Sequence, residues 1–178
     1  DIGGPMAIIQ FLSSGKERIA LPAALVCDHL VQANVGAIPD LKVAEKGNVE
    51  TYEFLRDVSR RYGFDFWPAG SGICHQVFME NYNFPGCMML VTDSHTPTAC
   101  GMGMLAIGVG GADLVDALMG MEWELKMPKI IGVKLTGQLQ GWASAKDVIL
   151  KLTGMLSTKG ATNCVVEFFG EGAATLSA

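Results

Sequence analysis

The stretch CMMLVTDSHTP, residues 87–97, joins an apolar run to three chemically active side chains, Asp93, Ser94 and His95. A short apolar run of this kind is typical of a strand that is buried on both faces. We therefore expect a buried strand over residues 87–92, with the polar residues at its carboxyl end. In α/β folds, binding and catalytic groups gather at the carboxyl ends of parallel strands. The stretch therefore predicts an α/β fold with a functional site directly after this strand.

All three histidines of the chain stand beside or close to polar groups of this kind. An isolated histidine is usually structural, because a buried imidazole needs only one partner for each nitrogen. A neighbouring carboxylate can also fix the tautomer and stabilise the imidazolium, as Asp28 can for His29 and Asp93 for His95. Adjacent residues need not touch, so the carboxylate of one motif can instead pair with the histidine of another. The predicted catalytic residues are Asp28, His29, His75, Asp93 and His95.

The composition predicts a packed, acidic protein and argues against nucleic-acid binding and membrane insertion. The 178 residues are 49% hydrophobic and 17% charged, which is ample for a buried core. The net charge is −5 and no basic stripe is interleaved with aromatic residues, so we expect no nucleic-acid partner. The longest apolar stretch, 99–112, contains five glycines. It falls short of the roughly 20 residues that span a bilayer.

The five cysteines show no spacing that is typical of a metal site. None of them forms a C-x-x-C pair, and an odd number argues against a complete disulfide framework. Cys87, Cys100 and Cys164 lie among apolar residues, so we expect them in the core. Cys27 and Cys74 stand close to a histidine, but two thiols do not make a cluster site. We expect a reducing compartment and no metal ligand from this chain.

Strands and helices are expected to alternate along the chain, which is typical of βαβ units and a mostly parallel sheet. Pro128 marks a break in the pattern and predicts a domain boundary near residues 126–129. The polar segment 33–50 is expected to form a loop, and Ser144 with Asp147 is expected to begin the last helix. We predict strands over 19–26, 87–92, 130–136 and 164–169, and helices over 6–12, 52–62, 77–80, 114–119 and 144–160.

A glycine-rich segment matches a nucleotide-binding motif only superficially. Residues 101–106 fit the dinucleotide fingerprint G-x-G-x-x-A, which follows its strand immediately in true dinucleotide sites. Here eight residues, including Asp93, Ser94 and His95, separate Thr92 from the first glycine. We therefore expect no nucleotide site, and we interpret the glycines as a segment that packs closely against its neighbours.

Eight motifs together resemble the mitochondrial-type aconitases, in order and over almost the whole chain. The motifs are CDHL (27–30), FWPAGSGICHQ (66–76), ENY (80–82), TDSHTP (92–97), IGVGGAD (107–113), WELK (123–126), IGVKLTG (131–137) and KDVILK (146–151). The resemblance implies an aconitase-like three-layer α/β fold with mostly parallel sheets. Residues 1–127 would be the later part of a first α/β domain, and residues 128–178 the start of a second.

The resemblance also implies a hydro-lyase activity. Aconitases convert citrate to isocitrate through cis-aconitate in the tricarboxylic acid cycle, and the mitochondrial type works in the mitochondrial matrix. They use a 4Fe-4S cluster whose substrate-binding iron acts as a Lewis acid. The cluster cysteines, the substrate-clamping arginines and the serine base of the family belong to segments that this chain does not contain. Other segments or chains would therefore complete the fold and the site.

Within these motifs, site residues of the family match individual positions of this chain. Asp93, Ser94 and His95 match the substrate-binding triplet. Asp28 and His29 match the pair that helps to protonate the departing hydroxyl, and His75 matches a further active-site histidine. No cluster ligand is carried over. The resemblance therefore assigns the same residues that the three histidine contexts indicate.

Two alternatives to an aconitase stay open at this point. One is a non-catalytic aconitase-derived subunit of a larger mitochondrial assembly, which has little physical reason to keep six site residues. The other is a related hydro-lyase that acts on methylcitrate or homocitrate. The chain begins at Asp1 without an initiator methionine, so we expect a cleaved or partial chain.

Overall fold

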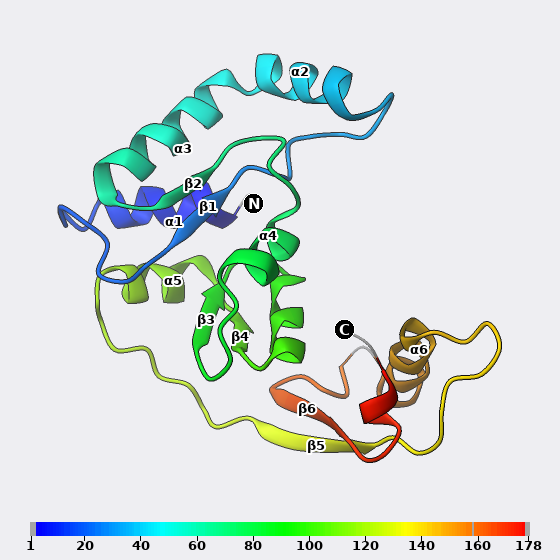
Figure 1. Ribbon diagram of the computed structural model, residues 1–178. Helices are drawn as coiled ribbons and strands as arrows, with labels where there is room; N and C mark the ends of the chain where they lie inside the picture. Colours follow the sequence, from blue (N-terminus) through cyan, green and yellow to red (C-terminus); the bar gives the residue numbers. More distant parts are fainter. Residues whose placement is uncertain (1–2, 158, 177–178) are drawn as a thin grey trace. The chain divides into compact units, whose positions relative to one another are not determined.

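The computed structural model describes residues 3–157 and 159–176, which have an α/β fold of helices and short strands (Figure 1). The strands form three two-stranded sheets, and the strands of every pair are parallel. The α/β fold class predicted from residues 87–97 is therefore confirmed. The chain divides into two compact units, Asp1–Trp123 and Glu124–Ala178, which we call the first and the second unit.

The first unit contains two parallel strand pairs and the helices around them. Strand β1 pairs with β2, and β3 pairs with β4. Helix α1 packs against α5, and α3 packs against β2. The elements are α1 (Gly3–Leu12), β1 (Ala24–Val26), α2 (Ala37–Gly47), α3 (Val49–Tyr62), β2 (Asp65–Trp67), α4 (Cys74–Asn81), β3 (Met88–Val91), the 3-10 helix η1 (Thr96–Met102), β4 (Leu105–Gly108) and α5 (Gly111–Leu118).

The glycine-rich segment contains a strand that the sequence did not predict. Strand β4 runs beside β3 in the register Met88↔Leu105 to Val91↔Gly108. Four residues between glycines are too short a run to show a period, so the pattern did not reveal it. The three-residue strand β2 was missed for the same reason. The predicted strand over 19–26 forms only at its end, as β1.

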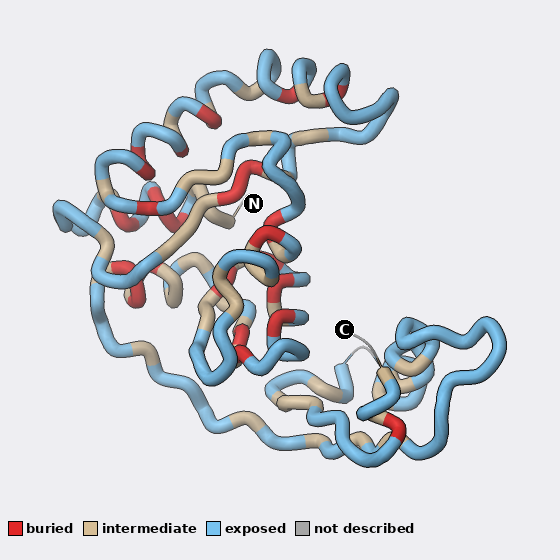
Figure 2. Tube along the Cα trace, in the orientation of Figure 1, coloured by how far each residue is buried: buried red, intermediate tan, exposed pale blue. Residues whose placement is uncertain are grey.

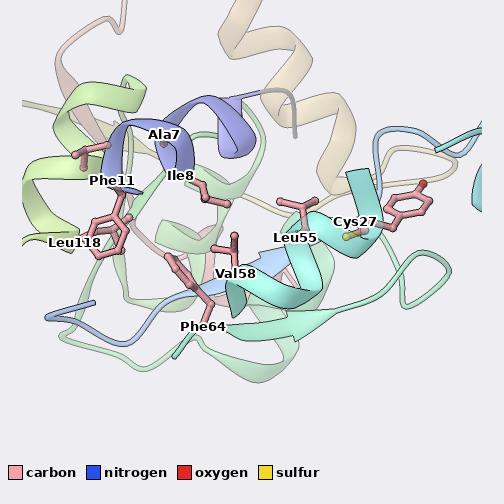
Figure 3. Close-up of a cluster of buried hydrophobic side chains, with 10 residues drawn as sticks. Ala7, Ile8, Phe11, Cys27, Leu55, Val58, Phe64 and Leu118 are labelled. Atoms are coloured by element: carbon pink, nitrogen blue, oxygen red, sulfur yellow. The ribbon is translucent and has the colours of Figure 1, made fainter. Parts of the chain in front are cut away.

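The core of the first unit lies between helices and the β1–β2 pair (Figure 3). Phe11 of α1 is fully buried, and its ring meets Tyr62 and Phe64 edge-on with centroids 5.5 and 6.5 Å away. Burial of one such aromatic side chain stabilises a fold by about 1.5–3 kcal/mol. The buried residues of this core are Ala7, Ile8, Phe11, Cys27, Tyr52, Leu55, Val58, Phe64, Val115 and Leu118.

The prediction of a loop over residues 33–50 was wrong, because helix α2 occupies Ala37–Gly47. Its apolar side chains Ile38 and Val43 are exposed, so the helix leaves no amphipathic pattern in the sequence. Its beginning is fixed by the buried side chain of Asp40. The Asp40 carboxylate accepts hydrogen bonds from the backbone N–H groups of residues 34, 35 and 36 at 2.7–3.2 Å. A single side chain thus orders the turn that starts α2.

Replacing Asp40 by alanine is expected to release this turn. The N–H groups of Val35, Gly36 and Asn34 stabilise the charged carboxylate and hold the pKa of Asp40 below its usual range. A carboxyl group whose pKa is lower in the folded protein than in the unfolded chain stabilises the fold. Its contribution is fully present at a pH above the ordinary pKa, about 3.9, and is lost as the pH falls through the lowered pKa. The amides of residues 34–36 should therefore exchange faster with solvent in Asp40→Ala than in the unchanged protein at neutral pH.

Hydrogen exchange followed by mass spectrometry measures this difference. Lys42→Ala, an exposed change on the same helix, is the matched control and should leave the exchange of residues 34–36 unchanged. Equal protection of these amides in the Asp40→Ala variant would contradict the role of its carboxylate.

The described part of the second unit contains a parallel strand pair, an α-helix and a 3-10 helix. Its elements are β5 (Lys129–Lys134), α6 (Ala145–Leu156), β6 (Cys164–Phe169) and the 3-10 helix η2 (Ala173–Thr175). The N–H and the hydroxyl of Ser144 donate to the Asp147 carboxylate at 2.7 and 2.9 Å, so the predicted helix start is confirmed. Figure 2 shows that most buried segments of the chain belong to the first unit. No described residue of α6 is buried.

The cysteines are distributed differently from the sequence prediction. Cys87 and Cys100 are exposed and Cys164 is half-buried, so the prediction that these three lie in the core was wrong. Cys87 directly precedes β3 and Cys164 begins β6, where a two-stranded sheet gives little cover, and Cys100 lies in the 3-10 helix η1. Cys27 and Cys74 are the buried ones. Among the described residues, no helix is both long and apolar enough to cross a membrane.

Candidate active site

The three histidine motifs of the first unit meet at the first turn of α4. Asp28 and His29 follow β1, whose strand partner β2 leads through a turn into α4. The residues from Asp93 to His95 follow β3 and lead into η1, which packs against α4. His75 lies in the first turn of α4 itself. The carboxyl ends of two strands from different sheets thus supply two of the motifs, and one helix supplies the third (Figure 1).

Asp28 and His29 form a hydrogen-bonded pair. The Asp28 Oδ1 lies 2.7 Å from the His29 Nδ1, and the carboxylate side chain is 6% exposed while the imidazole is 42% exposed. The other oxygen, Oδ2, accepts the backbone N–H of Cys74 at 2.7 Å. Burial favours a higher pKa for Asp28, but the Cys74 N–H and the His29 ring outweigh it and keep the pKa low. The ionised carboxylate can only accept, so the His29 Nδ1 carries a proton.

Asp93 is buried and anchors the turn that carries Ser94 and His95. Its Oδ2 accepts three hydrogen bonds, from the His95 N–H at 2.8 Å, the Thr96 N–H at 2.7 Å and the Thr96 hydroxyl at 2.9 Å. Burial favours a higher pKa for Asp93, but the Thr96 hydroxyl and these N–H groups outweigh it and lower the pKa. The carboxylate is therefore a fixed anion beneath the turn.

Of the two adjacent pairings that the sequence left open, the one between the Asp93 carboxylate and the His95 ring does not form. In the part of the chain that the structure describes, the Asp93 carboxylate bonds to backbone and to a hydroxyl, and the His95 Nδ1 instead lies 3.0 Å from the Ser94 Oγ. The reason is the tight turn between β3 and η1, which directs the donors of residues 95 and 96 onto the carboxylate. The predicted pairing of Asp28 with His29 is confirmed as a contact.

The histidines of two motifs lie close together on the outside of these carboxylates. The ring centroids of His75 and His95 are 5.4 Å apart, at an interplanar angle of 36°. His75 is half-buried, whereas Ser94, His95 and His29 are exposed. The Asp28 carboxylate thus holds an exposed imidazole, and the Asp93 carboxylate holds the backbone that carries an exposed hydroxyl and a second imidazole. Such groups can donate hydrogen bonds to a carboxylate-bearing ligand and can transfer protons.

Cys74 lies between the two buried carboxylates, at the start of α4. Burial and the nearby charges of Asp28 and Asp93 raise the pKa of its thiol to about 12, so the thiol is protonated at neutral pH. Its Sγ, a ring nitrogen of His75 and an oxygen of Asp93 lie within 4.8 Å of one another. A cysteine binds a metal as the thiolate, and an iron–sulfur cluster requires several such ligands, whereas this group contains one cysteine. The residues that the structure describes therefore do not fit a 4Fe-4S cluster.

Two residues of this site were not predicted from the sequence. Thr96 holds the Asp93 carboxylate, and the Cys74 N–H holds Asp28. An Asp followed three residues later by a Thr at the start of a turn is a recognisable side-chain–backbone pattern, and it could have indicated Thr96. The contact of Cys74 joins residues 46 positions apart, and no local pattern indicates it.

Comparison with known proteins relates the chain to one family over nearly its full length. The aconitase family (aconitate hydratase) matches residues 2–178. The mitochondrial aconitate hydratase of Gracilaria gracilis is 55% identical over 177 residues, which are 99% of this chain and 23% of that protein. The mitochondrial aconitate hydratase of Saccharomyces cerevisiae is 54% identical over 178 residues, 100% of this chain and 23% of that protein.

A relative that is named for a different activity matches almost as well. The mitochondrial homocitrate dehydratase of Saccharomyces cerevisiae is 53% identical over 177 residues, which are 99% of this chain and 22% of that protein. The chain thus spans less than a quarter of the length of these relatives. Since the family match covers all but the first residue, the chain belongs to the aconitase family.

Proposed function

We propose that the protein carrying this chain is an aconitate hydratase, which interconverts citrate and isocitrate through cis-aconitate. The observation that supports this most is the meeting of Asp28–His29, His75 and the triplet 93–95 at one helix start, within a chain of the aconitase family. The names of the relatives support a mitochondrial location and a tricarboxylate substrate.

In this proposal the residues of the chain bind the substrate and move a proton. The pair of Asp28 and His29 protonates the hydroxyl group that leaves, because the carboxylate stabilises the imidazolium and the ring is exposed to a ligand. Ser94, His95 and His75 donate hydrogen bonds to the carboxylates of the substrate. Asp93 stays ionised and holds the turn in place. The base that removes the carbon-bound proton lies outside this chain.

The proposal also places a 4Fe-4S cluster in the complete protein, held by segments outside this chain. When bound, the cluster supplies a Lewis acid. The chain's own cysteines give no support for ligation here, because only one of them belongs to the three-residue group at the site. Further segments or chains complete the site.

A homocitrate dehydratase is the second candidate, since a relative of that name is 53% identical. The two activities differ in the length of the substrate's variable arm, and residues outside this chain would select between them. A non-catalytic subunit is the third candidate. Against it stands the gathering of the six site residues at the start of one helix, which a purely structural part would not need.

Steady-state kinetics of the full-length protein distinguish these candidates. After anaerobic reconstitution with iron and sulfide, we expect it to form cis-aconitate from both citrate and isocitrate, followed by ultraviolet absorbance. We expect kcat/KM for homocitrate to be at least about 10-fold lower, the size of effect that a mismatched substrate arm produces. A preference for homocitrate would favour the second candidate. If the protein carries the cluster and converts neither acid, the result would contradict the proposal that it is an enzyme.

A further inference from the structure

Thr96 is almost completely buried, at 1% exposure, although it is polar and lies directly beside two exposed site residues. Its hydroxyl and its N–H both donate to the Oδ2 of Asp93, at 2.9 and 2.7 Å. The proposed mechanism gives Thr96 no role of its own. A buried hydroxyl aimed at a buried carboxylate nevertheless requires an explanation, because desolvating both groups is costly.

The contacts close a loop around the reactive residues. Asp93 and Thr96 flank Ser94 and His95, and the two bonds between the flanking residues fix both ends of this short segment. The third donor on the same oxygen is the N–H of His95 itself. The position of the His95 backbone is thus set by the Asp93 carboxylate, and the carboxylate is in turn set by Thr96.

Thr96 also keeps the Asp93 carboxylate charged. Of the groups that lower the Asp93 pKa, the Thr96 hydroxyl has the largest effect. The titratable groups that face this carboxylate are few in the described structure: the Cys74 thiol lies beside it, and a ring nitrogen of His75 lies within 4.8 Å of one of its oxygens. Without the hydroxyl, the carboxylate would lose one charge-assisted bond and its orientation.

We propose that Thr96 is a positioning residue of the active site, whose hydroxyl holds the Asp93 carboxylate so that Ser94 and His95 stay aligned for the substrate. The catalytic part of this inference rests on the proposed function. The hydrogen bonds that Thr96 and the His95 N–H donate to Asp93, which we call the clamp, rest only on the geometry of residues 93–96.

Three variants of the full-length protein test the inference by kinetics. Thr96→Val keeps the shape and removes the hydroxyl, Thr96→Ser keeps the hydroxyl, and Thr98→Val makes the same change in the same helix. Thr98 is an apt control because its hydroxyl donates to the neutral carbonyl of His95 at 2.7 Å. We expect Thr96→Val to lower kcat/KM about 10-fold, the effect of losing one hydrogen bond to a charged group. The Ser variant and the control should stay within about threefold of the unchanged protein.

The pH profile separates positioning from a general loss of stability. The hydroxyl lowers the Asp93 pKa, so its removal raises that pKa, and the acid limb of kcat/KM should move to higher pH in Thr96→Val only. Unchanged kinetics in Thr96→Val would overturn the inference. A loss that the Ser variant shares, or one without a shift of the acid limb, would overturn it as well.

Hydrogen exchange tests the clamp without any activity. The amides of residues 95 and 96 donate to Asp93, so they should exchange at least about 10-fold faster in Thr96→Val and not in Thr98→Val. If the unchanged protein is inactive, the proposed function fails and this measurement alone decides on Thr96. Equal exchange in Thr96→Val and the unchanged protein would overturn the inference.

Discussion

Replacing His29 by alanine in the full-length protein is expected to lower kcat for the conversion of citrate to isocitrate by about 100-fold. The structure holds the Nδ1 of His29 at 2.7 Å from the Asp28 carboxylate and leaves the ring 42% exposed. The remaining nitrogen is therefore available to a ligand. Without the ring, the hydroxyl that leaves has no positioned proton donor. KM should change little, because the carboxylates of the substrate are bound by other residues in this proposal.

His29→Gln separates proton transfer from hydrogen bonding. Glutamine is of similar reach and can donate a hydrogen bond, but it cannot transfer a proton at neutral pH. We therefore expect the same loss of kcat as in His29→Ala, measured by cis-aconitate absorbance. Leu30→Ala, a change at the neighbouring exposed position, should retain turnover within about threefold. Near-normal turnover in His29→Gln would contradict the role of His29 as proton donor.

The sequence indicated the residues that the structure brings together at the candidate site, because the signals are local. Asp28 and His29 are adjacent, and the triplet at 93–95 ends an apolar run that forms β3. Position at the carboxyl end of a strand is a property of a few neighbouring residues. The α/β class followed from the same runs, and all three observed strand pairs are parallel.

The sequence was not sufficient to predict the partners of these residues. Asp28 is held by a backbone N–H that lies 46 positions away, and such a contact exists only once β1 and α4 are folded. The sequence left open whether Asp93 holds the ring of His95, and the turn after β3 directs backbone donors onto the Asp93 carboxylate instead. Helix α2 was missed because Asp40, rather than an apolar face, fixes its start.

The second large effect is expected for Asp28→Asn, which preserves the shape of the side chain. The two oxygens of Asp28 have different partners: Oδ2 accepts the Cys74 N–H, and Oδ1 accepts the Nδ1 proton of His29. In asparagine only one of the two atoms is an acceptor. The Cys74 N–H can only donate, so the amide oxygen must face this N–H group. The amide NH₂ then faces the His29 Nδ1.

An NH₂ group facing Nδ1 requires this nitrogen to accept, which leaves the imidazole neutral with its proton on Nε2. The imidazolium that protonates the leaving hydroxyl loses its carboxylate partner, and kcat should fall by about 100-fold or more. Asp57→Asn, an exposed carboxyl on α3, is the matched control and should retain full turnover. Normal turnover in Asp28→Asn would contradict the paired action of the carboxylate and the ring.

The double variant Asp28→Asn, His29→Ala shows whether the two residues act as one unit. If Asp28 acts only through the ring, removal of the ring leaves nothing for the carboxylate to do, and the double variant should be about as slow as His29→Ala alone. If the losses add, Asp28 has a separate role. Because the asparagine oxygen still accepts the Cys74 N–H, the lost charge of the carboxylate would then be responsible, rather than this bond. The comparison of kcat in the two single variants and the double variant therefore distinguishes a proton-transfer pair from two residues with separate roles.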